Sequence, residues 1–348
     1  MPKTVLITGA GGFIGSAMCA EFKKRYNVTG IVRESASSID EDECLLVTAD
    51  LKDFERIENL FRKCRPEIVI HCAGLAHQKL GGVGAEQYME TNCSNSVHLA
   101  EIALKHNPKV LFIFLSSVSV YGENLGSSSK GERTGPAFNE NDKCLPTSDY
   151  AKSKLLAEEG LLSCFSTANK SGNLFILRLA PVYDENWTLN LDRRIFLPNH
   201  IFYVKFGKGE QRMSALAKYN LVEFVRFLID NKSSVYMKKN GHNLLKHQSN
   251  NSASIINVTD EEPYSFSDMI KVFKMAGRYV YRPVIHIPLS WVWLLTRFLG
   301  CMFPKRKKWL HSCYEKLAID LIYSNKRMKL TGFQPKYSLL SLFPQSKN

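Results

Sequence analysis

Hydrophobic and polar positions alternate along the first half of the chain between short apolar runs and longer stretches with helical spacing. The apolar runs predict strands at Thr4–Thr8, Val28–Val32, Leu45–Thr48, Glu67–Cys72, Val110–Leu115 and Leu174–Leu179. Helical stretches lie between them, notably Phe54–Cys64 and Ser94–His106. Strands that alternate with helices in this way indicate an α/β fold, built on a parallel, doubly wound sheet.

A glycine-rich turn, Thr8-Gly9-Ala10-Gly11-Gly12-Phe13-Ile14-Gly15, follows the first predicted strand and opens a helix. Gly9 can take the positive φ of a tight turn, Gly12 lets a pyrophosphate approach the backbone, and Gly15 lets helix and strand pack closely. The free N–H groups and positive dipole end of the helix would face the phosphates. The G-x-x-G-x-x-G spacing is one residue longer at its start than the common fingerprint, but its strand–turn–helix context predicts a Rossmann-type dinucleotide site.

The alternation of strands and helices fades after Pro181. Two later stretches are expected to return to the sheet, namely a helix around Asn220–Asp230 and a strand at Ile255–Val258. We therefore expect a dinucleotide-binding domain of residues 1–183, joined by 216–258. Residues 184–215 and 259–348 would form a smaller, largely C-terminal substrate-binding region.

Composition adds constraints on partners and compartment. The chain has 348 residues, 45% hydrophobic and 23% charged, which is ordinary for a globular protein. Its net charge of +13 favours anionic partners such as nucleotides or an acidic membrane surface, although a solvated basic surface explains the charge equally well. Nine cysteines without a C-x-x-C pair indicate reduced thiols in the cytoplasm, and without H-E-x-x-H spacing we expect no metal. No signal peptide is expected, nor a nucleic-acid partner.

One apolar segment, Ile285 to Phe303, is followed by the basic run Pro304-Lys305-Arg306-Lys307-Lys308. His286 and Arg297 interrupt it, and it is too short and polar for a predicted membrane span. Two interpretations stay open: a core or lid helix, or an interfacial helix with a basic anchor that gives residues 285–308 weak membrane-surface association.

Two further motifs carry hydroxyl and amine chemistry. Tyr150 and Lys154 are four residues apart, so on a helix they share a face, and the ammonium would lower the pKa of the phenol. An exposed helix pair is the alternative when this motif is taken alone. The run Ser116-Ser117-Val118-Ser119-Val120-Tyr121-Gly122 ends the fifth predicted strand, at the edge where open α/β sheets bind ligands.

The chain resembles the extended short-chain dehydrogenases/reductases, and more narrowly the nucleotide-sugar branch of the NAD-dependent epimerase/dehydratase family. The resemblance rests on three motifs in their order along the chain: the glycine turn, S-S-x-S-V-Y-G and Y-x-x-x-K. The resemblance covers nearly the whole chain. Further matching segments are Asp50-Leu51, His71-Cys72-Ala73-Gly74-Leu75-Ala76-His77, Asn92, Arg178-Leu179-Ala180-Pro181-Val182-Tyr183, Gly207-Lys208-Gly209-Glu210-Gln211-Arg212, Asn257–Pro263 and Gly332–Tyr337. Asp184 stands where the family has glycine.

The resemblance implies roles for particular residues. Tyr150 is the acid/base on the sugar oxygen, Lys154 tunes it and holds the nicotinamide ribose, and Ser117 bonds the reacting oxygen. Arg212 would grip the sugar-nucleotide diphosphate, with a surface ion pair as the alternative. His77 and Ser119 are further candidates for the substrate site, although His77 could simply cap a loop. The implied cofactor residues are Gly9, Gly12, Phe13, Ile14, Gly15, Arg33, Asp50, Leu51, Ala73, Gly74, Asn92, Tyr150, Lys154 and Pro181.

Two departures from the family pattern narrow the reaction. Val118 and Ser119 stand where 4,6-dehydratases carry an acidic pair, which argues against dehydration. The second strand ends at Val32 where NAD-binding relatives carry an acid, and Arg33 follows, which favours the 2′-phosphate of NADP. NAD remains the alternative cofactor, because the carboxylate of Glu34 could still bind the ribose hydroxyls.

The function expected from this resemblance is NAD(P)-dependent reduction, at carbon 4, of a UDP-4-keto-6-deoxy-(N-acetyl)hexosamine for bacterial surface polysaccharide. A UDP-hexose 4-epimerase that acts on UDP-glucose or UDP-N-acetylglucosamine with bound NAD is the second possibility. A non-catalytic NADP-binding regulator is the third, although Tyr150 and Lys154 are both intact. Members of the family often dimerise through a four-helix bundle, so a homodimer is expected.

Overall fold

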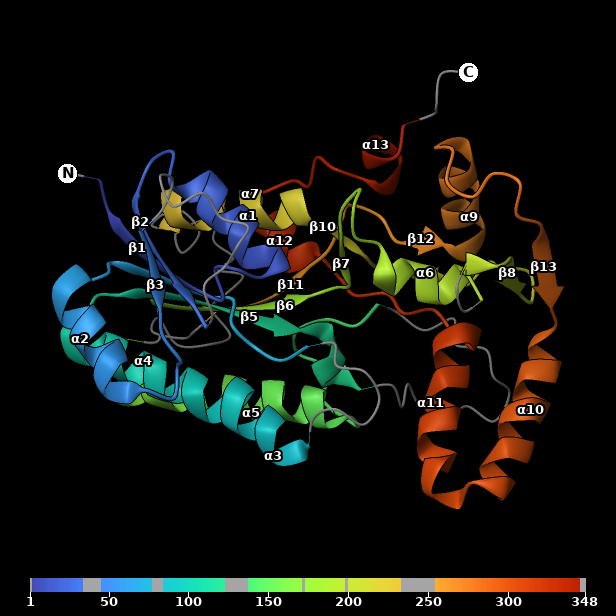
Figure 1. Cartoon of the computed structure of the whole chain (residues 1–348), viewed down its shortest axis with the longest axis horizontal. Coiled ribbons are helices and arrows are strands. Elements are labelled where there is room, and N and C mark those ends of the chain that lie inside the picture. The colour runs from blue at the N-terminus through green and yellow to red at the C-terminus, as the bar shows by residue number, and fades with distance from the viewer. Residues whose placement is uncertain are drawn as a thin grey trace.

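Seven buried parallel strands form the central sheet in the order β11-β6-β5-β4-β1-β2-β3 (Figure 1). This computed structural model describes residues 2–33, 45–76, 84–122, 137–170, 173–197, 200–232 and 254–344. The strands are β1 (Thr4–Thr8), β2 (Asn27–Val32), β3 (Leu45–Thr48), β4 (Ile68–His71), β5 (Leu111–Ser117), β6 (Leu174–Leu179) and β11 (Ser254–Val258). The order reverses direction between β1 and β4, as in a Rossmann-type sheet, which confirms the predicted fold class.

Helices cover both faces of the sheet (Figure 1). One layer contains α1 (Phe13–Phe22), α7 (Lys218–Asp230) and α12 (Lys326–Leu330). The opposite layer contains α2 (Phe54–Cys64), α4 (Asn95–His106) and α5 (Asp149–Thr167). Short helical segments α3 (Ala85–Tyr88) and the π-helical η1 (Met89–Ser94) lead into α4, and the 3₁₀ turn η2 (Val118–Tyr121) follows β5.

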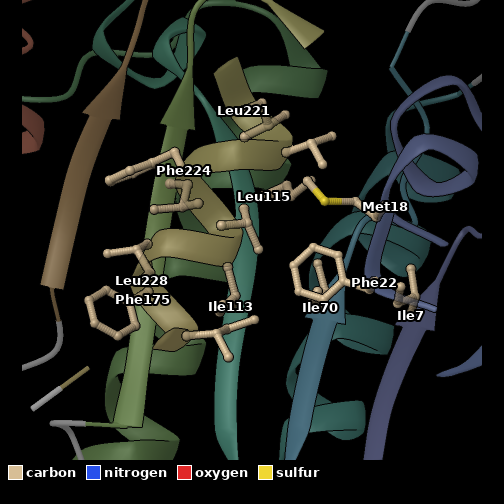
Figure 2. Packing of buried hydrophobic residues seen from close by; sticks show 14 of the residues in the cluster. Ile7, Met18, Phe22, Ile70, Ile113, Leu115, Phe175, Leu221, Phe224 and Leu228 are labelled. Carbon is tan, nitrogen blue, oxygen red and sulfur yellow. The ribbon is translucent and has the colours of Figure 1, made fainter. Parts of the chain in front are cut away.

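The two layers follow from the side-chain alternation of each strand. In β1, Val5 and Ile7 face the α1–α7 layer, whereas Leu6 faces the α2–α4–α5 layer. Because both faces are covered, the strands are apolar at nearly every position rather than at every second one. Figure 2 shows the first core, where Phe224 of α7 and Phe22 of α1 pack against the sheet.

A smaller region packs at one end of the sheet around its own apolar cluster, which includes Tyr183, Tyr203, Phe266 and Phe273. Its strand pairs are β7 (Val182–Tyr183) with β10 (Leu216–Ala217), β8 (Tyr203–Phe206) with β13 (Val284–Ile287), and β9 (Arg212–Met213) with β12 (Tyr264–Ser265). Its helices include α6 (Leu189–Ile195), α9 (Phe266–Met275), α10 (Leu289–Met302), η5 (Pro304–Arg306), α11 (Lys307–Ala318) and α13 (Leu339–Leu342).

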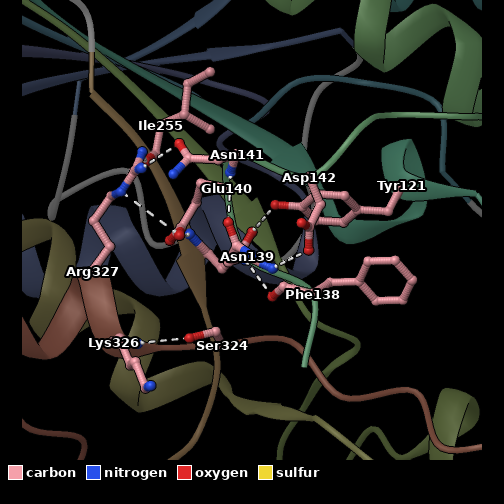
Figure 3. A network of polar contacts seen from close by, with 11 residues as sticks. Tyr121, Phe138, Asn139, Glu140, Asn141, Asp142, Ile255, Ser324, Lys326 and Arg327 are labelled. Atoms are coloured by element: carbon pink, nitrogen blue, oxygen red, sulfur yellow. Dashed lines mark hydrogen bonds and ion pairs between the residues drawn. The ribbon is translucent and has the colours of Figure 1, made fainter. Parts of the chain in front are cut away.

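The chain returns to the sheet near its C-terminus. Met328 and Phe333 are buried in the α1–α7 core, although the sequence places them in the substrate region. Arg327 donates to the carbonyl of Ile255 at 2.8 Å and to Asn141 at 3.0 Å, and it lies 3.7 Å from Glu140 (Figure 3). These contacts fasten α12 to β11 and to the segment before α5. The division into a dinucleotide domain and a substrate region stays a prediction.

Candidate active site

Predicted site residues from five different segments meet at one edge of the sheet. Because all the strands are parallel, their carboxyl ends share this edge. Gly9 follows β1, Arg33 follows β2, Ala73 lies two residues after β4, Ser117 ends β5 and Pro181 lies two residues after β6. The topology therefore brings together positions that are up to 172 residues apart in the sequence, from Gly9 to Pro181.

The glycine turn fits the backbone of a dinucleotide. Gly9 has a φ of +66°, and a β-carbon there would lie 2.8 Å from the backbone nitrogen of Ala73. A β-carbon at Gly15 would lie 2.1 Å from the carbonyl oxygen of Gly9, so helix α1 can approach the turn only with glycine there. No side chain caps α1 at Gly12, and its first turn has no acidic residue. The N-terminus of α1 therefore suits a pyrophosphate.

A chain of hydrogen bonds supports the loop after β4. Ser96 donates its hydroxyl proton to the carbonyl of Asn92 at 2.7 Å, so it accepts from Nε2 of His71 at 2.8 Å. Nδ1 of His71 is then free to accept from the hydroxyl of Thr8 at 2.6 Å, and Thr8 in turn accepts from the backbone N–H of Ala73 at 3.2 Å. Burial lowers the pKa of His71 to about 3, so the ring is neutral.

Asn92 completes this support from the π-helical turn η1. Its side chain accepts from the N–H of Leu75 at 2.7 Å and donates to the carbonyl of Leu75 at 3.0 Å. It also donates to Ser153 of α5 at 3.1 Å. A β-carbon at Gly74 would lie 3.0 Å from Oδ1 of Asn92 and 3.2 Å from Nζ of Lys154. Asn92 thus holds the Ala73–Leu75 loop against α5, and its role in supporting the site stays a prediction.

Helix α5 presents Tyr150 and Lys154 beside the end of β5. Ser148 caps the helix by accepting from the N–H of Ala151 at 3.3 Å, which fixes the first turn that carries Tyr150. Lys154 is buried, and its ammonium donates to the carbonyl of Leu115 at 2.9 Å and lies 4.6 Å from the ring centre of Phe114. The structure therefore brings Ser117, Tyr150 and Lys154 to one place.

The pKa shifts of Tyr150 and Lys154 differ from those expected from the sequence. Burial raises the pKa of Tyr150 above its ordinary value, and hydrogen bonding with Ser117 offsets only part of that rise. Burial also lowers the pKa of Lys154 to about 8. The prediction that the Lys154 ammonium lowers the pKa of the phenol is wrong for this structure, because Lys154 donates to a strand carbonyl and desolvation dominates at both groups.

The turn after Ser117 explains why no acidic pair stands there. Val118 is buried in a small apolar cluster with Val120 and Tyr121, so it belongs to the core. The hydroxyl of Ser117 donates to that of Ser119 at 3.1 Å and accepts from the Ser119 N–H at 3.2 Å. Ser119 thus orients Ser117.

The residues expected at the adenosine end lie at the edge strands. Val32 is buried at the end of β2, and Arg33 is exposed directly after it. Asp50 is exposed after β3 and accepts from the N–H of Lys52 at 3.0 Å, while Leu51 packs against the second core. These positions suit contacts to an adenosine, and the roles of the residues stay predictions.

Arg212, which is predicted to bind substrate, stands apart from this group. Arg212 is half-exposed on β9 and forms an ion pair with Asp320, with Nη2 and Oδ2 at 2.9 Å. Its predicted grip on a diphosphate is untested, and the alternative ion pair is present. His77 lies outside the described residues.

A cluster around Asp184, which stands where the family has glycine, was not predicted from the sequence. This buried carboxylate pairs with Lys218 and accepts from the N–H of Trp187 at 2.7 Å. The Lys218 ammonium lies 4.5 Å from the ring centre of Phe13, and the Trp187 ring lies 5.7 Å from the same ring. The cluster joins the smaller region to the glycine turn, and only the aspartate in place of glycine could have indicated it.

A buried ion pair behind α5 was also not predicted from the sequence. Arg178 donates to Glu158 with Nη2 and Oε2 at 2.7 Å, and Ser116 donates to the same carboxylate. Glu158 lies four residues beyond Lys154, so the spacing of the helix face was the available signal. The pair fixes α5 to β5 and β6.

Comparisons with known proteins agree with this geometry. The model of the NAD dependent epimerase/dehydratase family matches residues 5–236. The UDP-glucose 4-epimerase of Vibrio cholerae is 29% identical over 253 residues, which are 70% of this chain and 73% of that protein. UDP-glucuronate 4-epimerase 4 of Arabidopsis thaliana is 30% identical over 169 residues, or 45% of this chain and 37% of that protein.

Solved structures share the fold over nearly the whole chain. UDP-glucuronic acid 4-epimerase from Bacillus cereus, in complex with NAD, superposes with a TM-score of 0.67 at 18% identity and covers 98% of this chain and 96% of that one. UDP-glucose 4-epimerase from Thermotoga maritima, with UDP-glucose, gives a TM-score of 0.67 at 22% identity and the same coverage. Because the family model spans two thirds of the sequence, this chain belongs to the NAD-dependent epimerase/dehydratase family of enzymes, within the extended short-chain dehydrogenases/reductases.

Proposed function

We propose that this chain is an NAD(P)-dependent reductase of a nucleotide-linked 4-keto sugar. The substrate class is a UDP-4-keto-6-deoxy-(N-acetyl)hexosamine, reduced at carbon 4 for bacterial surface polysaccharide. The observation that carries the proposal is the meeting of Ser117, Tyr150 and Lys154 at the carboxyl end of β5, beside the glycine turn.

The three side chains have complementary roles in this reaction. NAD(P)H supplies the hydride. Tyr150 donates its phenolic proton to the oxygen of the former carbonyl, and the raised pKa keeps that proton on the phenol until it is needed. The N–H of Ser119 orients Ser117, whose hydroxyl proton would turn from the Ser119 hydroxyl to the same substrate oxygen and position it. Lys154 places a buried positive charge next to the loop that carries Gly74.

Arg33 supports NADP as the cofactor. It is an exposed cation at the end of β2, and the side chain before it is the buried, uncharged Val32. A guanidinium at this place suits a 2′-phosphate, whereas NAD is favoured by a carboxylate there. An NADPH that exchanges with solution would agree with net reduction, because NADP⁺ would have to leave the enzyme after each turnover.

A UDP-hexose 4-epimerase that keeps NAD bound is the second candidate. The relatives favour it, because both curated proteins described above are UDP-sugar 4-epimerases. The non-catalytic regulator has no comparable support, since the three side chains proposed to be catalytic, Ser117, Tyr150 and Lys154, lie together. We also propose that the protein works in the cytoplasm as a homodimer, in which α5 packs against its copy.

Tyr150→Phe tests the catalytic assignment. With a UDP-4-keto-6-deoxyhexosamine and NADPH, the variant should lose about a hundred- to ten-thousand-fold in kcat while NADPH affinity stays close to wild type, because only the proton-transfer group is lost. Tyr26→Phe is the matched control, since that hydroxyl bonds Asp230 on the outer surface. Near-normal turnover of Tyr150→Phe would overturn the assignment.

A further inference from the structure

The α10–α11 hairpin carries an apolar stripe that faces solvent. Trp291, Leu294, Leu295, Phe298 and Met302 recur at helical spacing along α10, so they share one face. Their exposed fractions are 74%, 64%, 56%, 60% and 57%. Large neighbouring apolar side chains on one exposed face mark a binding surface rather than ordinary surface scatter.

The position of the hairpin suits contact with a large, flat partner. Figure 1 shows α10 and α11 side by side, projecting away from the sheet, with their connecting turn at the far end. Both ends of the hairpin are fastened to the smaller region. Before α10, β13 pairs with β8, and after α11 the N–H of Leu321 donates to the carbonyl of Arg212 at 2.8 Å. The stripe is therefore held at a fixed place on the molecule.

Charge indicates the sign of the partner. Residues 269–314 contain nine lysines and arginines and no aspartate or glutamate. The basic run begins in the turn η5 between the two helices and continues into the first residues of α11, and Arg306 and Lys307 are exposed there. This arrangement favours an anionic surface and disfavours a second copy of the same hairpin, because the two basic turns would repel each other.

The polar groups of α10 indicate that the partner is lipid rather than protein. The hydroxyl of Thr296 already donates to the carbonyl of Trp293 at 2.9 Å, and the guanidinium of Arg297 lies 4.8 Å from the ring centre of Trp293. The only strong hydrogen-bonding group in the apolar stripe is the indole N–H of Trp291, and tryptophan, with its apolar ring and polar tip, is enriched where membranes meet water. The stripe matches the apolar face of a helix that lies in a membrane interface, above which basic side chains meet headgroups.

We propose that the α10–α11 hairpin docks this enzyme on an anionic lipid surface. The stripe Trp291–Met302 enters the headgroup–acyl boundary, while Arg306 and Lys307 contact lipid phosphates. The hairpin lies in the membrane–water interface and does not cross the bilayer. At about 1.5 Å of rise per residue, the 14 residues of α10 are shorter than the roughly 30 Å hydrocarbon core. Among the described residues no helix is long and apolar enough to span a bilayer.

Vesicle sedimentation of the full-length protein tests this proposal. The protein should sediment with vesicles of phosphatidylcholine that contain phosphatidylglycerol, less with phosphatidylcholine alone, and less again in high salt, which screens the cationic turn. Leu294→Gln combined with Phe298→Gln should weaken binding about 100-fold, because each buried apolar side chain contributes about a factor of 10 or more. Arg306→Gln combined with Lys307→Gln should weaken binding to the anionic vesicles about 25-fold, at about fivefold per cation.

Matched control variants distinguish binding through the hairpin from nonspecific binding to vesicles. Leu45→Gln with Leu340→Gln removes two apolar side chains of similar exposure, 65% and 56%, elsewhere on the chain. Arg62→Gln with Lys63→Gln removes two exposed cations from α2, at the opposite end of the molecule. Both should bind vesicles like wild type. Unchanged melting temperature and NADPH affinity show that each variant is folded.

Three results would overturn the proposal. The first is that the wild-type protein fails to sediment with anionic vesicles. The second is an equal loss of vesicle binding in the hairpin variants and the control variants. The third is that the hairpin variants convert a dimer to a monomer in analytical ultracentrifugation without a change in lipid binding. The last result would assign the stripe to a second copy of the chain.

Discussion

At the scale of single residues, burial decides the charge of the groups around the site. Lys154 is held by a strand carbonyl and the ring of Phe114, and desolvation lowers its pKa to about 8. His71 is completely buried between two hydroxyls, and the same effect lowers its pKa to about 3. Neutral imidazole beneath a cationic lysine keeps the loop after β4 free of a second positive charge.

Acid titration of His71 gives a prediction for stability. Its folded pKa of about 3 lies below the ordinary value of 6.5, so its contribution to stability is complete above pH 6.5 and is lost as the pH falls toward 3. Between pH 6.5 and about 4.5 this single group should remove about 2 kcal/mol from the free energy of unfolding.

Urea unfolding across that range, compared with His71→Gln, measures this contribution, because carboxylates titrate alike in both proteins. The variant should lose less stability than wild type as the pH falls. Parallel pH dependences in the two proteins would show that His71 is not held neutral.

At the scale of elements, the glycine turn makes a prediction about close packing. Gly15→Ala puts a β-carbon 2.1 Å from the carbonyl oxygen of Gly9, so α1 must move away from the turn. The overpacking should cost about 1–3 kcal/mol of stability and weaken NADPH binding, because the N-terminus of α1 moves with it.

Gly84→Ala is the control, since a β-carbon there has no atom within 4 Å. Fluorescence titration with NADPH and thermal melts check both variants. Wild-type NADPH affinity in Gly15→Ala would show that the turn does not carry the phosphates.

Elements with strong local patterns could be predicted from sequence. The strand β1 and the helix α2 have the expected bounds, because apolar alternation and helical spacing are local properties. The strands β7, β9 and β10 were not predicted, since two residues carry no periodic signal, and neither β8 nor the π-helical turn η1 was predicted. The same holds for the Asp184–Lys218 pair, whose members are 34 residues apart and meet only through tertiary packing.

At the scale of the whole molecule, the smaller region places Arg212 beside the segment that follows α11, where the α10–α11 hairpin ends. The guanidinium pairs with Asp320, two residues after α11. Such an exposed pair contributes only about 0–1 kcal/mol, so the guanidinium can exchange Asp320 for a diphosphate at little cost.

Arg212→Ala should weaken UDP-sugar binding about ten- to a hundredfold, which corresponds to one charge-assisted hydrogen bond, and leave NADPH binding unchanged. Arg212→Lys should recover only part, because lysine lacks the bidentate fork. Calorimetric titration with the UDP-sugar gives these affinities.

Asp320→Asn is the informative control, because it breaks the ion pair but keeps Arg212. Binding should be preserved or strengthened if Arg212 holds the diphosphate. An equal loss in Asp320→Asn and Arg212→Ala would assign Arg212 to structure alone.

In the proposed reaction, hydride passes from NADPH to carbon 4 of a keto sugar with net consumption of the cofactor. Mass spectrometry and NMR of the product formed with NADPH deuterated at the transferred position test this proposal most directly. Net reduction should place one deuterium at carbon 4 of each product molecule and release one NADP⁺ for each turnover. Interconversion of UDP-hexose 4-epimers with bound NAD, without deuterium incorporation or net NADPH oxidation, would contradict the proposal and establish the epimerase instead.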